Sequence, residues 1–378
     1  MKTQILTLLM ALASASPALA ETLRVGPNEA IRTIADAARL AKDGDVVEIT
    51  AGEYRGDVAV WSQKDLTIRG VGGMPRLLAM GASAEGKGIF VVRGERVRIE
   101  NLEFRGAKVR DKNGAGIRLE TGKLTVVGCK FLENENGILT SNNEQIELQV
   151  ERSEFGHNGA GDGQSHNLYA GKIASLKVSG SYFHHAKVGH LLKSRARDNR
   201  ILYNRLTDEI AGKASYELEF PSGGIAVVIG NLIEQSSSSE NFKIISMGAE
   251  GLAWPTNALY LSHNTIVNDR PQGARMLDAR DGVSLLAVNN VLVGRAASID
   301  LPAQKSLGNV EGDWPDFVRP QRDDYRLRND SKLLGAAEKA GFAGSFDLTP
   351  TAEYVHPVQI RAVAPKRWSP GAFQTPGG

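Results

Sequence analysis

The chain has 378 residues, 41 of them glycine, and its 45 basic and 43 acidic side chains give a formal net charge of +2 at pH 7. This balance, without a basic tail or a nucleic-acid motif, gives no reason to expect a nucleic-acid partner. The single cysteine, Cys129, excludes an intramolecular disulfide and argues against a cysteine-ligated zinc site. The many glycines suit a fold with frequent tight turns.

The N-terminal segment has the features of a secretory signal peptide. Lys2 supplies a positive charge, residues 5–13 form a short apolar run, and Ala18 and Ala20 define a small-x-small cleavage site. We therefore expect residues 1–20 to be removed and the mature chain to be exported, to the periplasm or the medium. No segment approaches the ~20 apolar residues that a spanning helix needs, so we expect no membrane span.

A short amphipathic helix is predicted next, over residues 29–42, with Ile34 and Ala37 on its apolar face. Short β-rich runs follow at 44–54 and 66–70. This order resembles the start of secreted right-handed parallel β-helix proteins of the pectate-lyase-like superfamily. In that superfamily such a helix caps the open end of the solenoid, where strand edges would otherwise be exposed.

An internal repeat supports the same fold independently of this resemblance. A tetrapeptide ending in a large apolar residue recurs, and its final residues are Phe104, Phe131, Phe155, Phe183, Leu206, Ile233, Ile266 and Leu292. The number of residues between one of these positions and the next is about what one coil of three short strands and their turns needs, because each strand residue advances the chain by roughly 3.3 Å. We predict an all-β chain, a single right-handed parallel β-helix over 21–300 with a short N-terminal capping helix. An irregular C-terminal cover, made of a closing segment and an extended tail, is expected over 301–378.

In the last four repeats an asparagine lies two positions before the final apolar residue. These residues are Asn204, Asn231, Asn264 and Asn290. Stacked one coil apart, their amides can form a hydrogen-bonded ladder. We therefore interpret them as structural.

Each tetrapeptide is followed by a second apolar run. The runs are 116–120, 137–141, 167–170, 190–193, 215–220, 243–247 and 275–280. They are expected to stack as one parallel sheet whose outward side chains line a continuous groove. If Tyr216, Leu218 and Phe220 point inward, Glu217 and Glu219 point into this groove.

A second resemblance begins at Lys193 and Ser194 and continues through Asn204 to Asn231. This stretch, residues 192–231, is similar to the central motif of polysaccharide lyase family six, the alginate lyase and chondroitinase B type. The resemblance implies a lyase that cleaves a linear acidic polysaccharide containing uronate sugars.

The resemblance also assigns candidate catalytic residues. Lys193 stands where the family has its catalytic base, whereas the position of the family's proton-donating arginine falls near Glu217. β-Elimination needs a base, an acid and a group that neutralises the sugar carboxylate. Lys193 could be the base beside Arg195, and His190 or Tyr169 could be the acid or an alternative base.

The carboxylates leave other interpretations open. Glu217 and Glu219 could hold a calcium ion, the one candidate cofactor, and position the sugar. Alternatively, they could act as the carboxylate pair of a glycoside hydrolase, together or with Asp278, because such pairs lie roughly 5–10 Å apart. A third interpretation is a non-catalytic carbohydrate-binding envelope protein.

Further polar residues are expected to contact the polymer, and we expect the protein to be a monomer. These substrate-binding candidates are His166, Lys172, His184, Arg197, Asp278 and Arg280. His184 and its neighbour His185 should point to opposite faces of a strand, so we do not expect them to share a metal ion.

Overall fold

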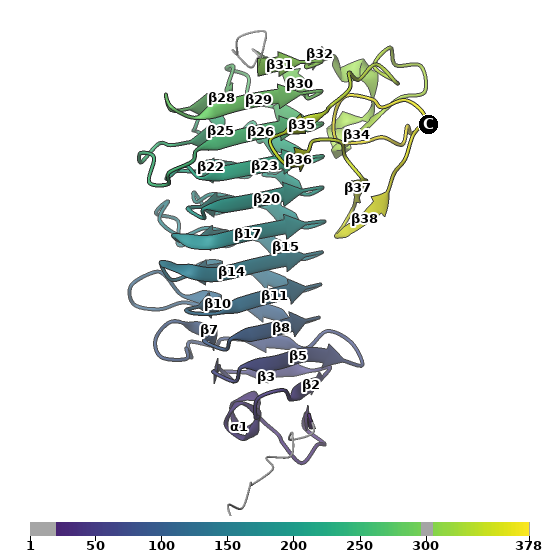
Figure 1. Ribbon diagram of the computed structural model, residues 1–378. Helices are drawn as coiled ribbons and strands as arrows, with labels where there is room; N and C mark the ends of the chain where they lie inside the picture. Colours follow the sequence, from purple (N-terminus) through teal and green to yellow (C-terminus); the bar gives the residue numbers. More distant parts are fainter. Residues whose placement is uncertain (1–19, 296–304, 378) are drawn as a thin grey trace, which may run out of the picture.

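The computed structural model describes residues 20–295 and 305–377, which form a long parallel β-helix (Figure 1). Apart from Ala20, the predicted signal peptide lies outside the described residues, and so does the predicted boundary at residue 300. In the described part of the chain, no helix is long and apolar enough to cross a membrane.

The β-helix has three parallel sheets, A, B and C, to which each coil contributes in turn. Sheet A has 12 strands: β1 (Thr22–Val25), β2 (Val46–Thr50), β5 (Asp65–Val71), β8 (Arg96–Glu100), β11 (Lys123–Val127), β14 (Asn143–Glu151), β17 (Ile173–Ser179), β20 (Asp198–Leu202), β23 (Ile225–Ile229), β26 (Ala258–Ser262), β29 (Ser284–Val288) and β31 (Ser306–Leu307). Sheet B has 11 strands: β3 (Glu53–Arg55), β6 (Arg76–Leu78), β9 (Glu103–Arg105), β12 (Lys130–Leu132), β15 (Glu154–Gly156), β18 (Tyr182–His184), β21 (Arg205–Thr207), β24 (Leu232–Gln235), β27 (Thr265–Asn268), β30 (Val291–Gly294) and β32 (Val310–Gly312). Sheet C has nine strands: β4 (Ala59–Trp61), β7 (Gly88–Val92), β10 (Ala115–Leu119), β13 (Asn136–Thr140), β16 (Leu168–Ala170), β19 (Leu192–Ser194), β22 (Leu218–Phe220), β25 (Lys243–Met247) and β28 (Arg275–Ala279).

The predicted repeat is confirmed as an in-register stack inside the solenoid. The eight final apolar residues pair with one another along sheet B, from β9 to β30. The rings of Phe131 and Phe155 stack with centroids 4.7 Å apart, and those of Phe155 and Phe183 with centroids 4.6 Å apart. The large apolar side chain at this position therefore fills the core of one coil after another.

The predicted asparagine ladder is also confirmed. Asn204 donates from its side-chain amide to Asn231 at 3.0 Å, and Asn231 donates in the same way to Asn264 at 3.0 Å. Asn264 continues the ladder to Asn290 at 2.9 Å, and Asn290 extends it to Asn309 at 2.7 Å. These amides satisfy each other and fix the bends before β21, β24, β27, β30 and β32.

The capping helix α1 (Ile34–Leu40) covers the N-terminal end of the solenoid, but it is shorter than predicted (Figure 1). Its start is set by Thr33, whose hydroxyl accepts the backbone N–H of Asp36 at 3.0 Å. Ile31, expected inside the helix, instead forms a parallel bridge to Val25.

The C-terminal part is more ordered than the irregular cover that was expected. It contains the 3₁₀ turns η2 (Trp314–Asp316) and η3 (Pro320–Arg322) and three antiparallel pairs: β33 (Phe317–Arg319) with β34 (Asp324–Leu327), β35 (Phe342–Ala343) with β36 (Phe346–Asp347), and β37 (Ala352–Val355) with β38 (Gln359–Ala362).

The C-terminal segment does more than cover the C-terminal end of the solenoid, because it also runs back along the flank (Figure 1). The backbone N–H of Thr351 donates to the Tyr203 hydroxyl at 2.8 Å, and Ser262 donates to the carbonyl of Leu348 at 2.7 Å.

The ladder generates a stability prediction. Asn231→Ala should lower the free energy of unfolding by about 2–4 kcal/mol, because buried groups on Asn204 and Asn264 would lose their partners. Urea unfolding of the two proteins measures this difference. Asn113→Ala, in an exposed turn, is the control and should change stability by less than about 0.5 kcal/mol. An equal effect of the two substitutions would contradict the role of the ladder.

Candidate functional site

The outer face of sheet C carries a row of polar residues held in register by parallel pairing. Tyr169 of β16 pairs with Lys193 of β19, which pairs with Glu219 of β22. The row continues through Ser246 of β25 to Asp278 of β28. The predicted stacking of the second apolar runs into one sheet is therefore confirmed, and it places these side chains on one face.

An ion-pair cluster joins the centre of this row to a distant loop. The Lys193 ammonium lies 3.4 Å from a carboxylate oxygen of Glu219 and 3.3 Å from one of Glu250. Arg195 contacts both oxygens of Glu250, at 2.7 and 2.6 Å, and donates to the Tyr169 hydroxyl. Two cations, a phenol and two carboxylates thus meet at one place.

Glu250 was not identified from the sequence. It lies in the loop between β25 and β26, 57 residues after Lys193, and no local pattern distinguishes it from other surface acids. Its side chain is 46% exposed, whereas those of Lys193 and Arg195 are 12% and 18% exposed. Lys193 lies on β19 and Arg195 directly follows this strand, whereas their partner Glu250 belongs to a more accessible loop.

His190 lies behind Glu219 in a buried position. Its Nε2 atom is 2.7 Å from a Glu219 oxygen, and its backbone N–H donates to Nδ1 of His166 at 2.9 Å. Burial lowers the pKa of His190, and burial also holds the pKa of His166 well below its ordinary value. His166 thus supports His190 from the interior and does not line the groove as a substrate contact.

Trp254, in the loop between β25 and β26, forms the edge of the cluster. Its indole N–H donates to the carbonyl of Arg195 at 3.0 Å. The Lys172 ammonium lies 4.9 Å from the centre of the Trp254 ring and 2.8 Å from Glu144. Lys172, a predicted substrate contact, therefore borders the site.

Arg118 is a second residue that sequence reasoning missed. It occupies the same register row, two strands before Tyr169, with Leu139 between them. Among the described residues, its Nε atom has no hydrogen-bond partner. The alternation of the run at 116–120 predicts its outward direction and could have identified it.

The expectation that Glu217 and Glu219 both face the groove is wrong for Glu217. Alternation requires an extended strand, but β22 begins only at Leu218 and Glu217 lies in a bend. Glu217 is fully buried, and its neighbouring charges are Asp208 and Arg270. Burial raises the pKa of Glu217 well above its ordinary value.

This placement separates the two carboxylates that were expected to act together. Glu219 is paired with His190 and Lys193, neither of which contributes to the surroundings of Glu217. The two acids therefore do not fit a shared calcium site, and they do not form a hydrolase pair facing one groove. Asp278, two strands beyond Glu219, is bound by Lys243 and Arg275, each at 2.6 Å.

Three other predicted substrate contacts lie away from the cluster. Arg197 follows β19 and pairs with Asp198 at 3.0 Å. Arg280 is an exposed residue just after β28. His184 belongs to β18 of sheet B, on a different face of the solenoid.

The expectation that His184 and His185 point to opposite faces is also wrong. β18 ends at His184, and His185 turns into the left-handed region with a φ of 45°. The two Nδ1 atoms consequently lie 2.8 Å apart. Neighbouring side chains oppose each other only while the strand continues.

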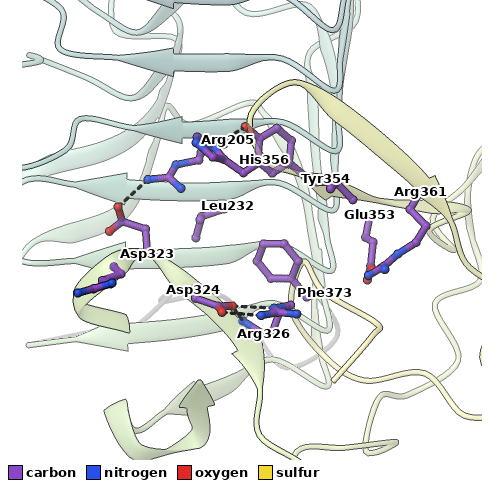
Figure 2. Close-up of a pocket in the computed structure, with 12 residues that line it drawn as sticks. Arg205, Leu232, Asp323, Asp324, Arg326, Glu353, Tyr354, His356, Arg361 and Phe373 are labelled. Carbon is purple, nitrogen blue, oxygen red and sulfur yellow. Dashed lines mark hydrogen bonds and ion pairs between the residues drawn. The ribbon is translucent and has the colours of Figure 1, made fainter. Parts of the chain in front are cut away.

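A separate pocket of about 340 Å³ lies between sheet B and the C-terminal segment, away from the cluster on sheet C (Figure 2). Its ion pairs include Arg205 with Asp323 at 2.5 Å, and Arg326 with Asp324 at 2.6 Å (Figure 2). The first of these pairs holds the C-terminal segment on the solenoid, so we place the candidate functional site on sheet C.

The comparisons with known proteins agree with this architecture. Residues 81–206 match the family model described as the right-handed β-helix region. No curated protein matched the chain at the level taken as significant.

Among solved structures, the crystal structure of pectate lyase Pel9A is similar over 94% of this chain and 96% of that chain, with 12% identity and a TM-score of 0.56. ORF18 of Geobacillus virus E2 is similar over 71% of this chain and 52% of that chain, with 14% identity and a TM-score of 0.44. The match to the family model and the likeness to pectate lyase Pel9A show that the chain is a right-handed parallel β-helix with a pectate-lyase-like fold.

The Glu219 ion pairs generate a pH prediction. Burial alone would raise the pKa of Glu219, but His190 and Lys193 together hold it below the ordinary 4.5. The pKa of Glu219 is therefore lower in the folded protein than in the unfolded chain. The ion pairs stabilise the fold fully at pH values above the pKa of the unfolded chain, and this stabilisation disappears as the pH falls through the pKa of the folded protein.

Glu219→Gln should therefore lower the free energy of unfolding by about 1.5–3 kcal/mol at neutral pH, with the difference shrinking in acid below the unfolded pKa. Urea unfolding across a pH series measures both effects. Glu147→Gln, which removes an exposed partner of Lys123, should cost about 0–1 kcal/mol. A Glu219→Gln difference that grows in acid would contradict this account.

Proposed function

We propose that this protein is an exported polysaccharide lyase that cleaves a linear, uronate-containing polysaccharide by β-elimination on the outer face of sheet C. The observation that carries the proposal is the meeting of Lys193, Arg195 and Tyr169 on that face. The likeness to pectate lyase Pel9A supports only the scaffold at this level of identity. Export rests on the signal-peptide pattern of residues 1–20.

The substrate carboxylate is assigned to Arg195. In the free protein the guanidinium holds both oxygens of Glu250, the geometry in which arginine binds a carboxylate. A uronate group presents the same two oxygens. The half-exposed Glu250 leaves while the less exposed Arg195, directly after β19, stays in place, so we place the sugar carboxylate at the position of Glu250.

Lys193 is assigned as the base that removes the proton next to the sugar carboxylate. As the base it reacts in the neutral amine form. The electron pair of the broken C–H bond forms the new C=C double bond, and the glycosidic C–O bond breaks. Arg195 stabilises the negative charge that accumulates on the carboxylate during this step.

Tyr169 is assigned as the acid. Its ring lies 5.8 Å from the Lys193 ammonium, and its hydroxyl accepts from Arg195. The hydroxyl gives its proton to the departing glycosidic oxygen, and the phenolate that remains is stabilised by Arg195 until the proton taken by Lys193 is returned. Glu219 of the next coil, which is itself paired with His190, holds Lys193 in position.

Arg118 would extend the positive face along the polymer. It lies two strands before Tyr169 in the same row, or roughly 10 Å by strand spacing. That distance suits contact with a neighbouring sugar of a linear chain and favours an acidic polymer over a neutral one.

The proposal predicts a loss of activity on substitution of the base. Lys193→Ala should lower the rate of ultraviolet-absorbing product formation at least about 100-fold on a polyuronate that the wild type cleaves, because general base catalysis is removed. Lys177→Ala, an exposed lysine on sheet A, is the matched control and should keep full activity.

Absorbance and reducing ends should be followed together over a panel of polyuronates and neutral polysaccharides. Full activity of Lys193→Ala would exclude Lys193 as the base. Reducing ends without new absorbance would identify a hydrolase, and neither signal on any polymer would favour a binding protein.

A further inference from the structure

Three histidines meet on the face of sheet B, away from the proposed lyase site. His157, His184 and His185 each offer a ring nitrogen, and these atoms all lie within 4.8 Å of one another. The Nδ1 atoms of His184 and His185 are 2.8 Å apart. His184 is buried, His185 is partly buried and His157 is exposed, so the cluster opens to solvent on one side.

The β-helix itself brings these residues together. His157 follows β15 and His185 follows β18, and these strands pair in register with Gly156 opposite His184. Both His157 and His185 turn into the left-handed region, with φ values of 57° and 45°. Their rings stack with centroids 4.6 Å apart. The same bend in two successive coils thus places one imidazole above the other.

The third ring, that of His184, packs against Gly156. A Cβ atom at Gly156 would lie 2.2 Å from Cε1 and 2.3 Å from Nε2 of His184. Only the missing side chain at Gly156 allows the His184 ring to lie flat against the coil below.

The polar surroundings match those of a metal-binding histidine. With Nδ1 of His184 directed toward His185, its Nε2 lies 3.5 Å from a carboxylate oxygen of Glu154. A metal-bound histidine usually gives its other ring N–H to such a carboxylate, which fixes the ring and strengthens the ligand. Glu154 is itself held by Lys130 at 2.7 Å.

The distances are close to those that a metal ion requires. Two nitrogens bound to one zinc ion at about 2.0–2.1 Å in tetrahedral geometry are about 3.4 Å apart. The Nδ1 atoms of His184 and His185, at 2.8 Å, are closer together than this zinc-bound distance. The limit of 4.8 Å on the distances among the three ring nitrogens is longer than it. Small ring rotations would therefore bring all three nitrogens to one ion, and the exposed side would leave a fourth position for water.

We propose that His157, His184 and His185 form a binding site for a divalent transition metal, with zinc as the reference ion, supported by Glu154. Three imidazoles select zinc, copper or nickel over calcium or magnesium, which prefer oxygen ligands. The ion would link the coils of β15 and β18 beside the C-terminal segment, where His356 lies 5.1 Å from the Tyr182 ring.

The test uses the mature chain without a histidine tag, freed of metal with a chelator and then dialysed. Titration calorimetry with zinc chloride should show one ion per chain, and cobalt chloride should produce a visible absorption band that zinc abolishes. Zinc should also raise the unfolding temperature, because an ion that binds only the folded state stabilises it.

Two variants remove single ligands without disturbing the bend. His157→Asn and His185→Asn keep a residue that tolerates the left-handed conformation, and each should weaken zinc binding by at least about 10-fold. His263→Asn is the matched control, because His263 also has a left-handed φ, of 51°, but lies outside the cluster. It should bind zinc as the wild type does.

No zinc uptake by the wild type would overturn the proposal. So would unchanged affinity in both His157→Asn and His185→Asn. Zinc binding that is weakened equally in His263→Asn would show that losing any histidine has this effect, and it would likewise overturn the proposal. Circular dichroism of the metal-free variants establishes that each has kept the β-helix.

Discussion

In-register parallel pairing is the constraint on which the rest of this structure depends. Each coil places a residue directly over its counterpart in the coil before, about 4.8 Å away. Identical side chains then stack on themselves, as Phe131, Phe155 and Phe183 do in the core. Buried asparagines such as Asn204 and Asn231 can satisfy one another for the same reason.

The same constraint builds the surface chemistry. Tyr169, Lys193 and Glu219 come from three coils, yet pairing of β16, β19 and β22 fixes them in one row. His157 and His185 stack because the same bend recurs in two successive coils. A rigid scaffold of this kind holds reacting groups without a deep pocket, so little motion is needed to place a polymer against them.

What the sequence could predict follows from this regularity. The regular spacing of Phe104, Phe131 and the later core residues of the repeat predicts the fold, because each coil must supply one large core residue. Glu219 could be placed on the outer face because alternation holds within β22, whereas Lys193 was singled out by the family resemblance. The capping helix was also predicted, although Thr33 starts it later than the pattern of apolar residues suggested.

The incorrect predictions and the missed residue Glu250 concern positions outside the regular strands. Glu217 precedes β22 and His185 follows β18, and in such bends alternation no longer gives the direction of a side chain. Glu250 reaches Lys193 from a loop between strands, so its role depends on loop geometry that no repeat encodes. Bends and loops, rather than strands, therefore decide which charges meet.

The most direct measurement of the central claim is the mass of the products released from a polyuronate. Elimination breaks the glycosidic bond without adding water, so the account predicts that every fragment from the reducing-end side of a cut carries an unsaturated end and is lighter by one water than the corresponding hydrolysis product. Mass spectrometry distinguishes the two. Fragments from the reducing-end side of a cut that have gained water would contradict a lyase reaction on sheet C.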